Sequence, residues 1–349
     1  MDSKNNKETD VTMKHWQQLS IEERLDILEI TSAKTHLPQQ AVEKDWWVTM
    51  VLKALSATRH FDLMSFKGGT SLSKGWNLIK RFSEDIDIAM RREGIFGISS
   101  TSGNQLAKVR RAARHYIIRE LPGEIAEALN SMGIVDFNIE PELTRTDNEG
   151  KTTELRATTH PSTIFVNYKS ILPDVSEYIE PKVKIEISCL SMDEPVEDKT
   201  LRSFMSEILK EEEDVEVRFP TVVPTRTFLE KIFLLHEEFQ KEKPRSKRMS
   251  RHIYDIEKIM DTDFGKSIAD RELYDSVVKH RSVFNRVEGI DYNLHNPSTL
   301  TFIPSDAVME EWAKDYRSMQ NNFIYEERSL SFDELIKRMM ELTAKLRMV

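Results

Sequence analysis

The stretch Phe66-Lys-Gly-Gly-Thr-Ser-Leu-Ser-Lys74, followed by Arg81-Phe-Ser-Glu-Asp-Ile-Asp-Ile88, predicts a tight glycine turn, a short helix and then a strand. Successive side chains of a strand alternate between its two faces, so Asp85 and Asp87 share one face and Ile86 points to the other. Two carboxylates beside a turn that approaches phosphate closely suit a Mg²⁺ or Mn²⁺ ion and a nucleoside triphosphate. Transfer of a nucleotide requires such an arrangement.

At these residues the sequence resembles the polymerase-β-type nucleotidyltransferases, whose signature is Gly-Gly or Gly-Ser, a helix, and then Asp-x-Asp. The flanks, Phe66-x-Gly-Gly-Thr-x-Leu72 and Arg81-Phe-Ser-x-Asp-x-Asp87, are similar to the AbiEii/AbiGii branch, the toxins of bacterial abortive-infection and type IV toxin–antitoxin pairs. Each motif alone is common, whereas the two in this order and a helix apart are specific. The alternative, an ordinary turn before a solvated strand edge, does not explain two acids within an apolar strand.

Composition limits the class of protein. The chain has 349 residues, 39% of them hydrophobic and 31% charged, which is typical of a soluble globular protein. Its single cysteine, Cys189, excludes an intramolecular disulfide and fits a reducing compartment. No segment resembles a signal peptide or approaches the ~18 apolar residues of a membrane helix. We therefore expect a cytoplasmic protein with no membrane segment.

The order of predicted elements indicates an α+β fold, a polymerase-β-like mixed sheet flanked by helices. We expect an N-terminal helical region over residues 1–55 and a nucleotidyltransferase catalytic domain over 56–222. Strand patterns weaken after Pro224, and amphipathic helical patterns replace them. This change predicts a C-terminal helical domain over 223–349.

The resemblance implies that Asp85 and Asp87 are catalytic and bind the metal ions. Glu186 is the candidate third carboxylate and metal ligand, because it lies on the polar face of a clear strand, Lys182–Leu190, beside Lys184. Many relatives carry Asp there, and the longer Glu changes the reach of the carboxylate. A surface ladder of Glu and Lys at a sheet edge is the alternative.

Residues near the glycine turn are the predicted triphosphate contacts. Gly68, Gly69 and Thr70 should cradle phosphate oxygens, because glycine permits close backbone approach and a helix starting near Ser71 directs its N–H groups at an anion. Arg81 and Ser83 precede the strand and could also contact the triphosphate or hold the loop.

Two positions in the C-terminal part complete the predicted site. Lys231 follows an apparent capping box, Thr227–Glu230, and the resemblance implies that it contacts the nucleotide. Asp255 belongs to a segment similar to the Arg-Asp-x-x-Asp helix of the family, although His252 stands where the first Asp is usual. Arg251 and Asp255 are four residues apart on this helix and could instead pair with each other.

The net charge of −9 argues against non-specific coating of nucleic acid, but two basic stretches could contact RNA. They are a predicted helix over 108–119 and a predicted loop over 243–251. The resemblance implies a metal-dependent enzyme that moves a nucleotide from a nucleoside triphosphate to an acceptor, expected to be RNA at the 3′ end of tRNA, under restraint by a cognate antitoxin. A binding regulator without catalysis, a kinase-like toxin and a nuclease toxin remain alternatives.

Overall fold

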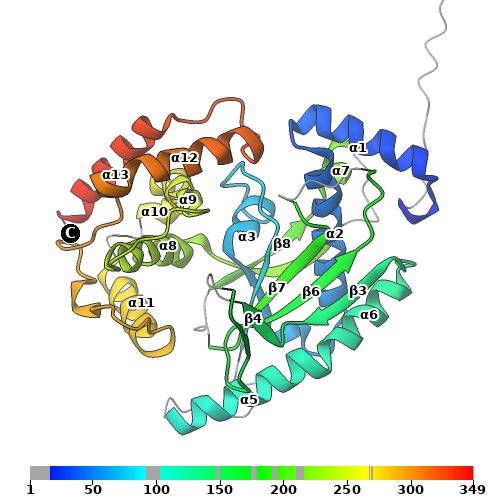
Figure 1. The fold of residues 1–349 in the computed structure, drawn as a ribbon, viewed down its shortest axis with the longest axis horizontal. Coiled ribbons are helices and arrows are strands. Elements are labelled where there is room, and N and C mark those ends of the chain that lie inside the picture. Colours follow the sequence, from blue (N-terminus) through cyan, green and yellow to red (C-terminus); the bar gives the residue numbers. More distant parts are fainter. Residues whose placement is uncertain are drawn as a thin grey trace, which may run out of the picture.

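A seven-stranded mixed sheet with strand order β3-β6-β7-β2-β1-β9-β8 forms the centre of the protein (Figure 1). Helices flank the sheet, and a group of further helices follows it along the chain. The predicted α+β fold is therefore confirmed. The computed structural model describes residues 16–91, 103–146, 150–173, 179–190, 195–209, 216–266, 268 and 270–348. The start of the predicted N-terminal helical region, residues 1–15, lies outside these ranges.

The middle of the sheet contains the motif that opened the sequence. Strand β1 (Met64–Lys67) leads into α3 (Gly68–Lys74), and the chain returns as β2 (Ile86–Met90), antiparallel to β1. On its other edge β2 pairs in parallel with β7 (Lys182–Ser188), and β1 pairs in parallel with β9 (Val217–Val222). The predicted succession of strand, turn, helix and strand is confirmed.

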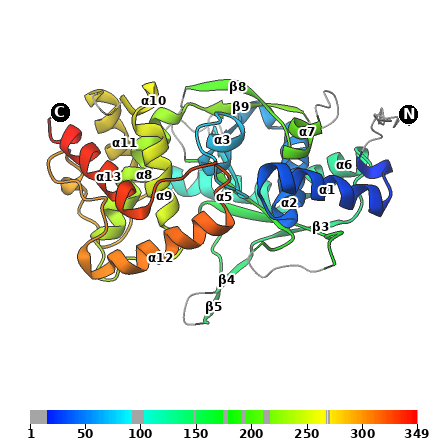
Figure 2. The same ribbon diagram turned by 90° about the horizontal axis from the view of Figure 1, so that it is seen from above.

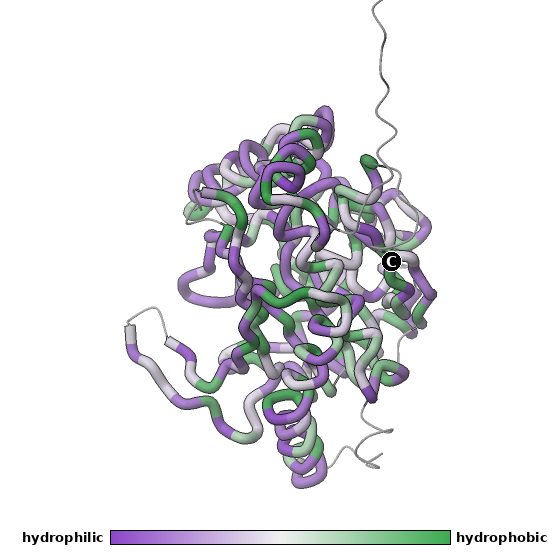
Figure 3. Tube along the Cα trace, turned by 90° about the vertical axis from the view of Figure 1, so that its right-hand side faces the viewer, coloured by the Kyte–Doolittle hydropathy of each residue, from purple (hydrophilic) through white to green (hydrophobic). Residues whose placement is uncertain are grey.

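The outer strands extend the sheet on both sides. β6 (Ser162–Tyr168) joins β7 to β3 (Phe137–Pro141), and β8 (Val196–Leu201) closes the opposite edge beside β9. A separate hairpin of β4 (Thr144–Thr146) and β5 (Thr152–Glu154) has exposed strand residues throughout. It projects from the body of the protein in two perpendicular directions of view (Figures 2 and 3).

One face of the sheet is covered by helix α2, which runs behind the strands in Figure 1. Its side chains from Ala41 to Leu55 are buried almost all round, because it packs against β7 and β9 on one side and other helices elsewhere. The helices and short helical turns of this part of the chain are η1 (Trp16–Gln18), α1 (Ile21–Thr35), α2 (Gln39–Ser56), η2 (Phe61–Leu63), α5 (Gly103–Arg119), α6 (Leu121–Ser131) and α7 (Phe204–Leu209).

The chain after β9 is helical, and its apolar side chains form a second hydrophobic core. Leu72 of α3 and Ile79, which follows it, belong to this second core, so α3 stands between the two cores. The domain boundaries near 55 and 222 stay predictions. The helices are α8 (Pro224–Phe239), α9 (Ser250–Met260), α10 (Asp263–Lys266), α11 (Arg271–Phe284), η4 (Tyr292–Leu294), α12 (Asp306–Asn322) and α13 (Phe332–Leu346).

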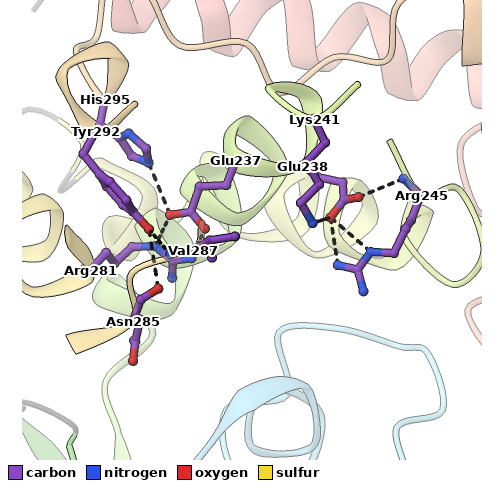
Figure 4. A network of polar contacts seen from close by, with 9 residues as sticks. All are labelled: Glu237, Glu238, Lys241, Arg245, Arg281, Asn285, Val287, Tyr292 and His295. Atoms are coloured by element: carbon purple, nitrogen blue, oxygen red, sulfur yellow. Dashed lines mark hydrogen bonds and ion pairs between the residues drawn. The ribbon is translucent and has the colours of Figure 1, made fainter. Parts of the chain in front are cut away.

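Ion pairs fasten the C-terminal end of α8 to its surroundings (Figure 4). Glu237 accepts hydrogen bonds from Arg281 at 2.8 and 2.6 Å and contacts His295 at 3.3 Å. Its neighbour Glu238 accepts from Arg245 in the following loop. Hydrogen bonds with His295 and Arg281 outweigh the effect of burial and lower the pKa of Glu237. Those from Arg245 and Lys241 do the same for Glu238 and lower its pKa to about 2. The network therefore holds α8, α11 and the loop after α8 as one unit.

Two predicted helix starts are wrong. Helix α3 begins at Gly68 rather than near Ser71, because the positive φ of Gly68 (+80°) completes the turn in one residue. Helix α8 begins at Pro224, whose fixed φ suits the first turn, so the apparent capping box at Thr227 lies inside the helix. Among the described residues, no helix is both long and apolar enough to cross a membrane.

Candidate active site

The three predicted carboxylates lie on neighbouring strands and on one face of the sheet. Asp85 immediately precedes β2, and Asp87 lies within it. The parallel register places Asp87 opposite Glu186 of β7. The alternate residues Ile86 and Ile88 are fully buried against the helical side of the sheet. Strand alternation therefore separates an apolar face, which packs, from a face that carries the acids.

The charges of these carboxylates are poorly compensated. Burial, together with the carboxylates of Glu186 and Asp85, raises the pKa of Asp87 to about 6 against the opposing effects of Lys67 and Lys231. Burial also raises the pKa of Asp85. A divalent cation between such groups favours their ionised forms, so the donor set fits a hard metal ion.

Glu186 has a second partner, because Lys184 Nζ lies 2.8 Å from its carboxylate on the same face of β7. Burial opposes the charge of Lys184, but Glu186, Asp85 and Asp87 outweigh burial and raise the pKa of the lysine. Within the described ranges, no group of three or more His, Cys, Asp or Glu side chains is arranged to hold one metal ion. The joint role of the three carboxylates as metal ligands therefore stays a prediction.

The two glycines of the turn lie in close contact with the acidic strand. A β-carbon on Gly68 would lie 2.0 Å from Asp87 Oδ2, and one on Gly69 would lie 2.8 Å from Arg81 Nη2 and 2.9 Å from Ser83 Oγ. No larger residue fits either position without moving a predicted site residue. The Gly-Gly pair thus allows the start of α3 to pack closely against the strand that carries Asp87.

Thr70 connects α3 to the segment before β2. Its hydroxyl donates to the carbonyl oxygen of Asp85 at 2.5 Å and lies 2.9 Å from Ser83 Oγ. Its side chain is only 1% exposed, so these contacts occupy it within the protein. In this structure Thr70 and Ser83 fix the position of Asp85 relative to the glycine turn.

Arg81, Lys231 and Asp255 form a closed cluster behind the glycine turn. Arg81 donates through Nε and Nη2 to the two oxygens of Asp255, each at 2.7 Å, and Lys231 Nζ lies 2.8 Å from the same carboxylate. Burial alone would raise the pKa of Asp255, but Arg81 and Lys231 outweigh it and hold that pKa well below its usual range. Asp255 therefore pairs across the fold and not with Arg251, its neighbour on α9.

A cavity of about 620 Å³ opens beside Asp85, bounded by the starts of β2 and β7 and by α9 and α12. Basic side chains dominate its polar lining, and the predicted basic loop supplies part of them. They are Lys44, Arg81, Lys182, Lys184, Lys247, Arg248 and Arg251. The acidic side chains of the lining are Glu84, Asp85, Glu180 and Asp315.

Sequence reasoning missed part of this cavity. Phe82, Met319 and Phe323 supply apolar lining from segments far apart in the chain, and no motif marks Met319 or Phe323. Lys44 is buried in α2 and binds Glu84 at 2.8 Å, a pairing between residues 40 positions apart. The available signals were the segment Arg81–Asp85, Lys184 of β7 and the basic stretch at the start of α9, all of which reach the cavity.

Comparison with known proteins assigns the chain to a family. The family model described as nucleotidyl transferase AbiEii toxin, type IV toxin–antitoxin system, matches residues 51–338. The chain belongs to the AbiEii family. No curated protein matches the chain in sequence. As an AbiEii family member it is a nucleotidyltransferase of the toxin–antitoxin class, which implies a nucleoside triphosphate substrate and an antitoxin partner.

Solved structures with a similar chain trace share little sequence with this AbiEii protein. JHP933 from Helicobacter pylori is 15% identical, with a TM-score of 0.42 over 89% of this chain and 94% of the other. The nucleotidyltransferase toxin MenT4 from Mycobacterium tuberculosis H37Rv is 16% identical, with a TM-score of 0.40 over 92% and 99%. A putative nucleotidyltransferase from H. pylori is 15% identical, with a TM-score of 0.42 over 89% and 96%.

Proposed function

We propose that this protein transfers a nucleotide from a nucleoside triphosphate to an RNA acceptor, the 3′ end of tRNA, and that a cognate antitoxin restrains it. The acceptor hydroxyl oxygen forms a bond to the α-phosphorus while the bond from that phosphorus to the bridging oxygen breaks, and pyrophosphate leaves. The hydroxyl proton passes to the carboxylate of Glu186. Both substrates are cytoplasmic molecules, so we place the reaction in the cytoplasm.

The main support is that a cavity rich in lysine and arginine opens directly beside Asp85. One of its acids is already paired, because Glu84 binds both Lys44 and Arg248. Arg251 lines the same cavity, and its buried Nε has no hydrogen-bond partner in the described part of the chain. A triphosphate supplies the negative charge that such a lining lacks, and guanidinium groups bind phosphate with paired donors.

Asp85 and Asp87 would hold Mg²⁺ or Mn²⁺, with Glu186 as the third candidate ligand. When bound, the ion neutralises phosphate charge and orients the reacting oxygens. Lys184 lies between the cavity and Glu186 on the same strand face, and we expect it to exchange its Glu186 partner for a phosphate oxygen.

Lys231 is a further proposed triphosphate contact, and its charge opposes the rise in the pKa of Asp87. Asp255 holds the Lys231 ammonium group at 2.8 Å and is itself enclosed, so it acts as a positioning residue rather than as a nucleotide contact. Arg81 links the cluster to the glycine turn, because its guanidinium group lies against Gly69.

The decisive experiment offers each of the four nucleoside triphosphates, labelled at the α-phosphate, to the full chain with total bacterial RNA and Mg²⁺. We expect label on a discrete RNA band, lost with a chelator and reduced by about 10²–10³-fold in Asp87→Ala. Asp136→Ala, which changes an exposed aspartate far from the carboxylate strand in sequence, is the matched control.

Other outcomes identify the alternatives. Label from the γ-phosphate instead of the α-phosphate would establish kinase-like transfer. RNA cleavage without triphosphate would establish a nuclease. Binding of triphosphate with no transfer to RNA or to protein would leave a regulator on the same scaffold.

A further inference from the structure

The basic residues of α5 do not form one surface. Arg110 and Arg114 are four residues apart, so they share a helix face, and that face is turned toward the protein, where Arg114 is buried and Arg110 half-buried. Lys108, Arg111 and Arg119 are exposed. A general electrostatic role would not need two arginines on the inner side, because burying a guanidinium group is costly without a partner.

The two inner arginines are incompletely paired. Arg114 donates to the carbonyl oxygen of Glu142 at 3.1 Å, but its buried Nη1 has no partner among the described residues. The buried Nε of Arg110 also lacks one in that part of the chain. A charged donor left without an acceptor costs more than a neutral one, so this face favours an anionic ligand.

The open face of β7 shows where these arginines lie relative to the candidate active site. Lys182, Lys184, Glu186 and Ser188 follow one another on this face, and the first two line the basic cavity. At the other end, Ser188 Oγ lies 3.0 Å from Nε2 of His160. The strand therefore has a cavity end, a carboxylate in the middle and an opposite end at Ser188.

Arg110 belongs to the Ser188 end. Helix α5 packs against β6, whose first residue, Ser162, pairs with Ile187 of β7. Burial and, to a smaller degree, the charges of Arg110 and Lys67 lower the pKa of His160, which contacts Ser188, to about 4. Lys67 is in turn the register partner of Asp87 in the β1–β2 pair. Positive charge from β1 and from α5 therefore acts on the Ser188 end of the strand.

The base of the β4–β5 hairpin adds a third arginine near this end. Arg145 donates to both oxygens of Glu142, at 3.1 and 2.7 Å, and its side chain remains half exposed. The backbone N–H of Glu142 donates to the carbonyl oxygen of Thr163, and Thr163 is the register partner of Glu186, so the Arg145–Glu142 pair lies beside the carboxylate row. The side chain of Arg114 donates to the backbone carbonyl oxygen of the same Glu142, and this hydrogen bond joins α5 to the hairpin.

We propose that Arg110 and Arg145, with Arg114 as their support, bind backbone phosphates of the acceptor RNA. The acceptor then reaches the Asp87–Glu186 centre from the Ser188 end, and the nucleoside triphosphate enters from the cavity end of β7. This inference rests on the proposed nucleotidyl transfer. An RNA strand fits better than a protein acceptor, because guanidinium groups in a row match successive phosphates in geometry and charge.

The test measures binding of a short, unstructured, fluorescein-labelled RNA to the full chain by anisotropy over a range of salt concentrations. Arg110→Gln and Arg145→Gln should each weaken RNA affinity about tenfold and reduce the slope of log K against log salt by about 0.7. Lys108→Gln and Arg111→Gln, on the same helix as Arg110, should leave both quantities unchanged. Affinity for the nucleoside triphosphate, measured by calorimetry with Mg²⁺, should be the same in all four variants.

Equal weakening by both pairs of variants would overturn the proposal, because it would mean diffuse attraction to the whole helix. Label transfer to a protein in place of RNA would overturn it as well. Normal triphosphate binding without any RNA binding would refute the acceptor site and leave the nucleotide cavity intact. Failure to bind triphosphate would instead count against the proposed function. Arg145 is exposed, so its variant remains informative if Arg110→Gln disturbs folding.

Discussion

Two groups of charged residues, both predicted as site residues, differ in how completely their charges are paired. In the carboxylate row, Asp87 faces Glu186 across parallel strands and its pKa is raised to about 6 by burial and by like charges. In the cluster behind the glycine turn, both oxygens of Asp255 are bound by cations, and its pKa is lowered. The first group favours an added cation, whereas the second is complete within the protein.

Asp255→Asn should have the largest effect on stability. It leaves Arg81 and Lys231 buried without a compensating carboxylate, which should lower the free energy of unfolding by about 3–5 kcal/mol. Urea unfolding measures this loss, and Asp136→Asn is the exposed control. A loss no greater than in the control would mean that the cluster is not closed.

The same variant should change the acid limb of the stability curve. Because the folded-state pKa of Asp255 is depressed, its stabilisation is present above the unfolded value of about 3.9 and disappears as pH falls through the folded pKa. Wild-type protein should therefore lose stability over this acidic range, and Asp255→Asn should lose less.

In the presence of a chelator, Asp87→Asn should have the opposite effect to Asp255→Asn on the pH dependence of stability. A folded-state pKa of about 6 means that the metal-free protein loses stability as pH rises from about 4 through 6, by up to about 3 kcal/mol. The amide variant should lack this slope and be at least as stable as wild type above pH 7. Urea unfolding across this pH range decides the matter, and destabilisation as severe as that of Asp255→Asn would remove the distinction between the two groups.

Gly68→Ala should have the smallest effect on stability of these variants. It tests how tightly the glycine turn contacts the Asp87 carboxylate. Gly68 and Gly133 both have positive φ, +80° and +77°, but a β-carbon on Gly68 would overlap Asp87, whereas one on Gly133 would meet nothing within 4 Å. Both alanine variants bear backbone strain, and we expect Gly68→Ala to cost about 1–2 kcal/mol more because of the overlap. Thermal unfolding and label transfer measure the two consequences, and equal losses would show that the contact with Asp87 is loose.

Some features of the site were readable from local sequence. The alternation that puts Asp85 and Asp87 on one face and Ile86 on the other is a property of any extended strand. The same rule placed Glu186 and Lys184 together on β7. Glycine at position 68 signalled a turn, although its positive φ also starts α3 three residues earlier than expected.

The pairing of charges was decided by the tertiary structure. Helical spacing offered Arg251 as the partner of Asp255, yet the fold provides Arg81, 174 residues away, and Lys231 on another helix. The basic residues of α5 likewise formed one stretch in sequence and divide into inner and outer faces in the structure.

Sequence by itself therefore determined the strand–turn–helix–strand motif, the strand faces and the helical character of the C-terminal part, because these depend on backbone periodicity over a few residues. Only the tertiary structure decided the Asp87–Glu186 register, the closed Arg81–Asp255–Lys231 cluster and the basic cavity beside Asp85. Ion pairing and cavity shape depend on distances between side chains that are remote in the chain, and those distances are set when the two hydrophobic cores pack around α3.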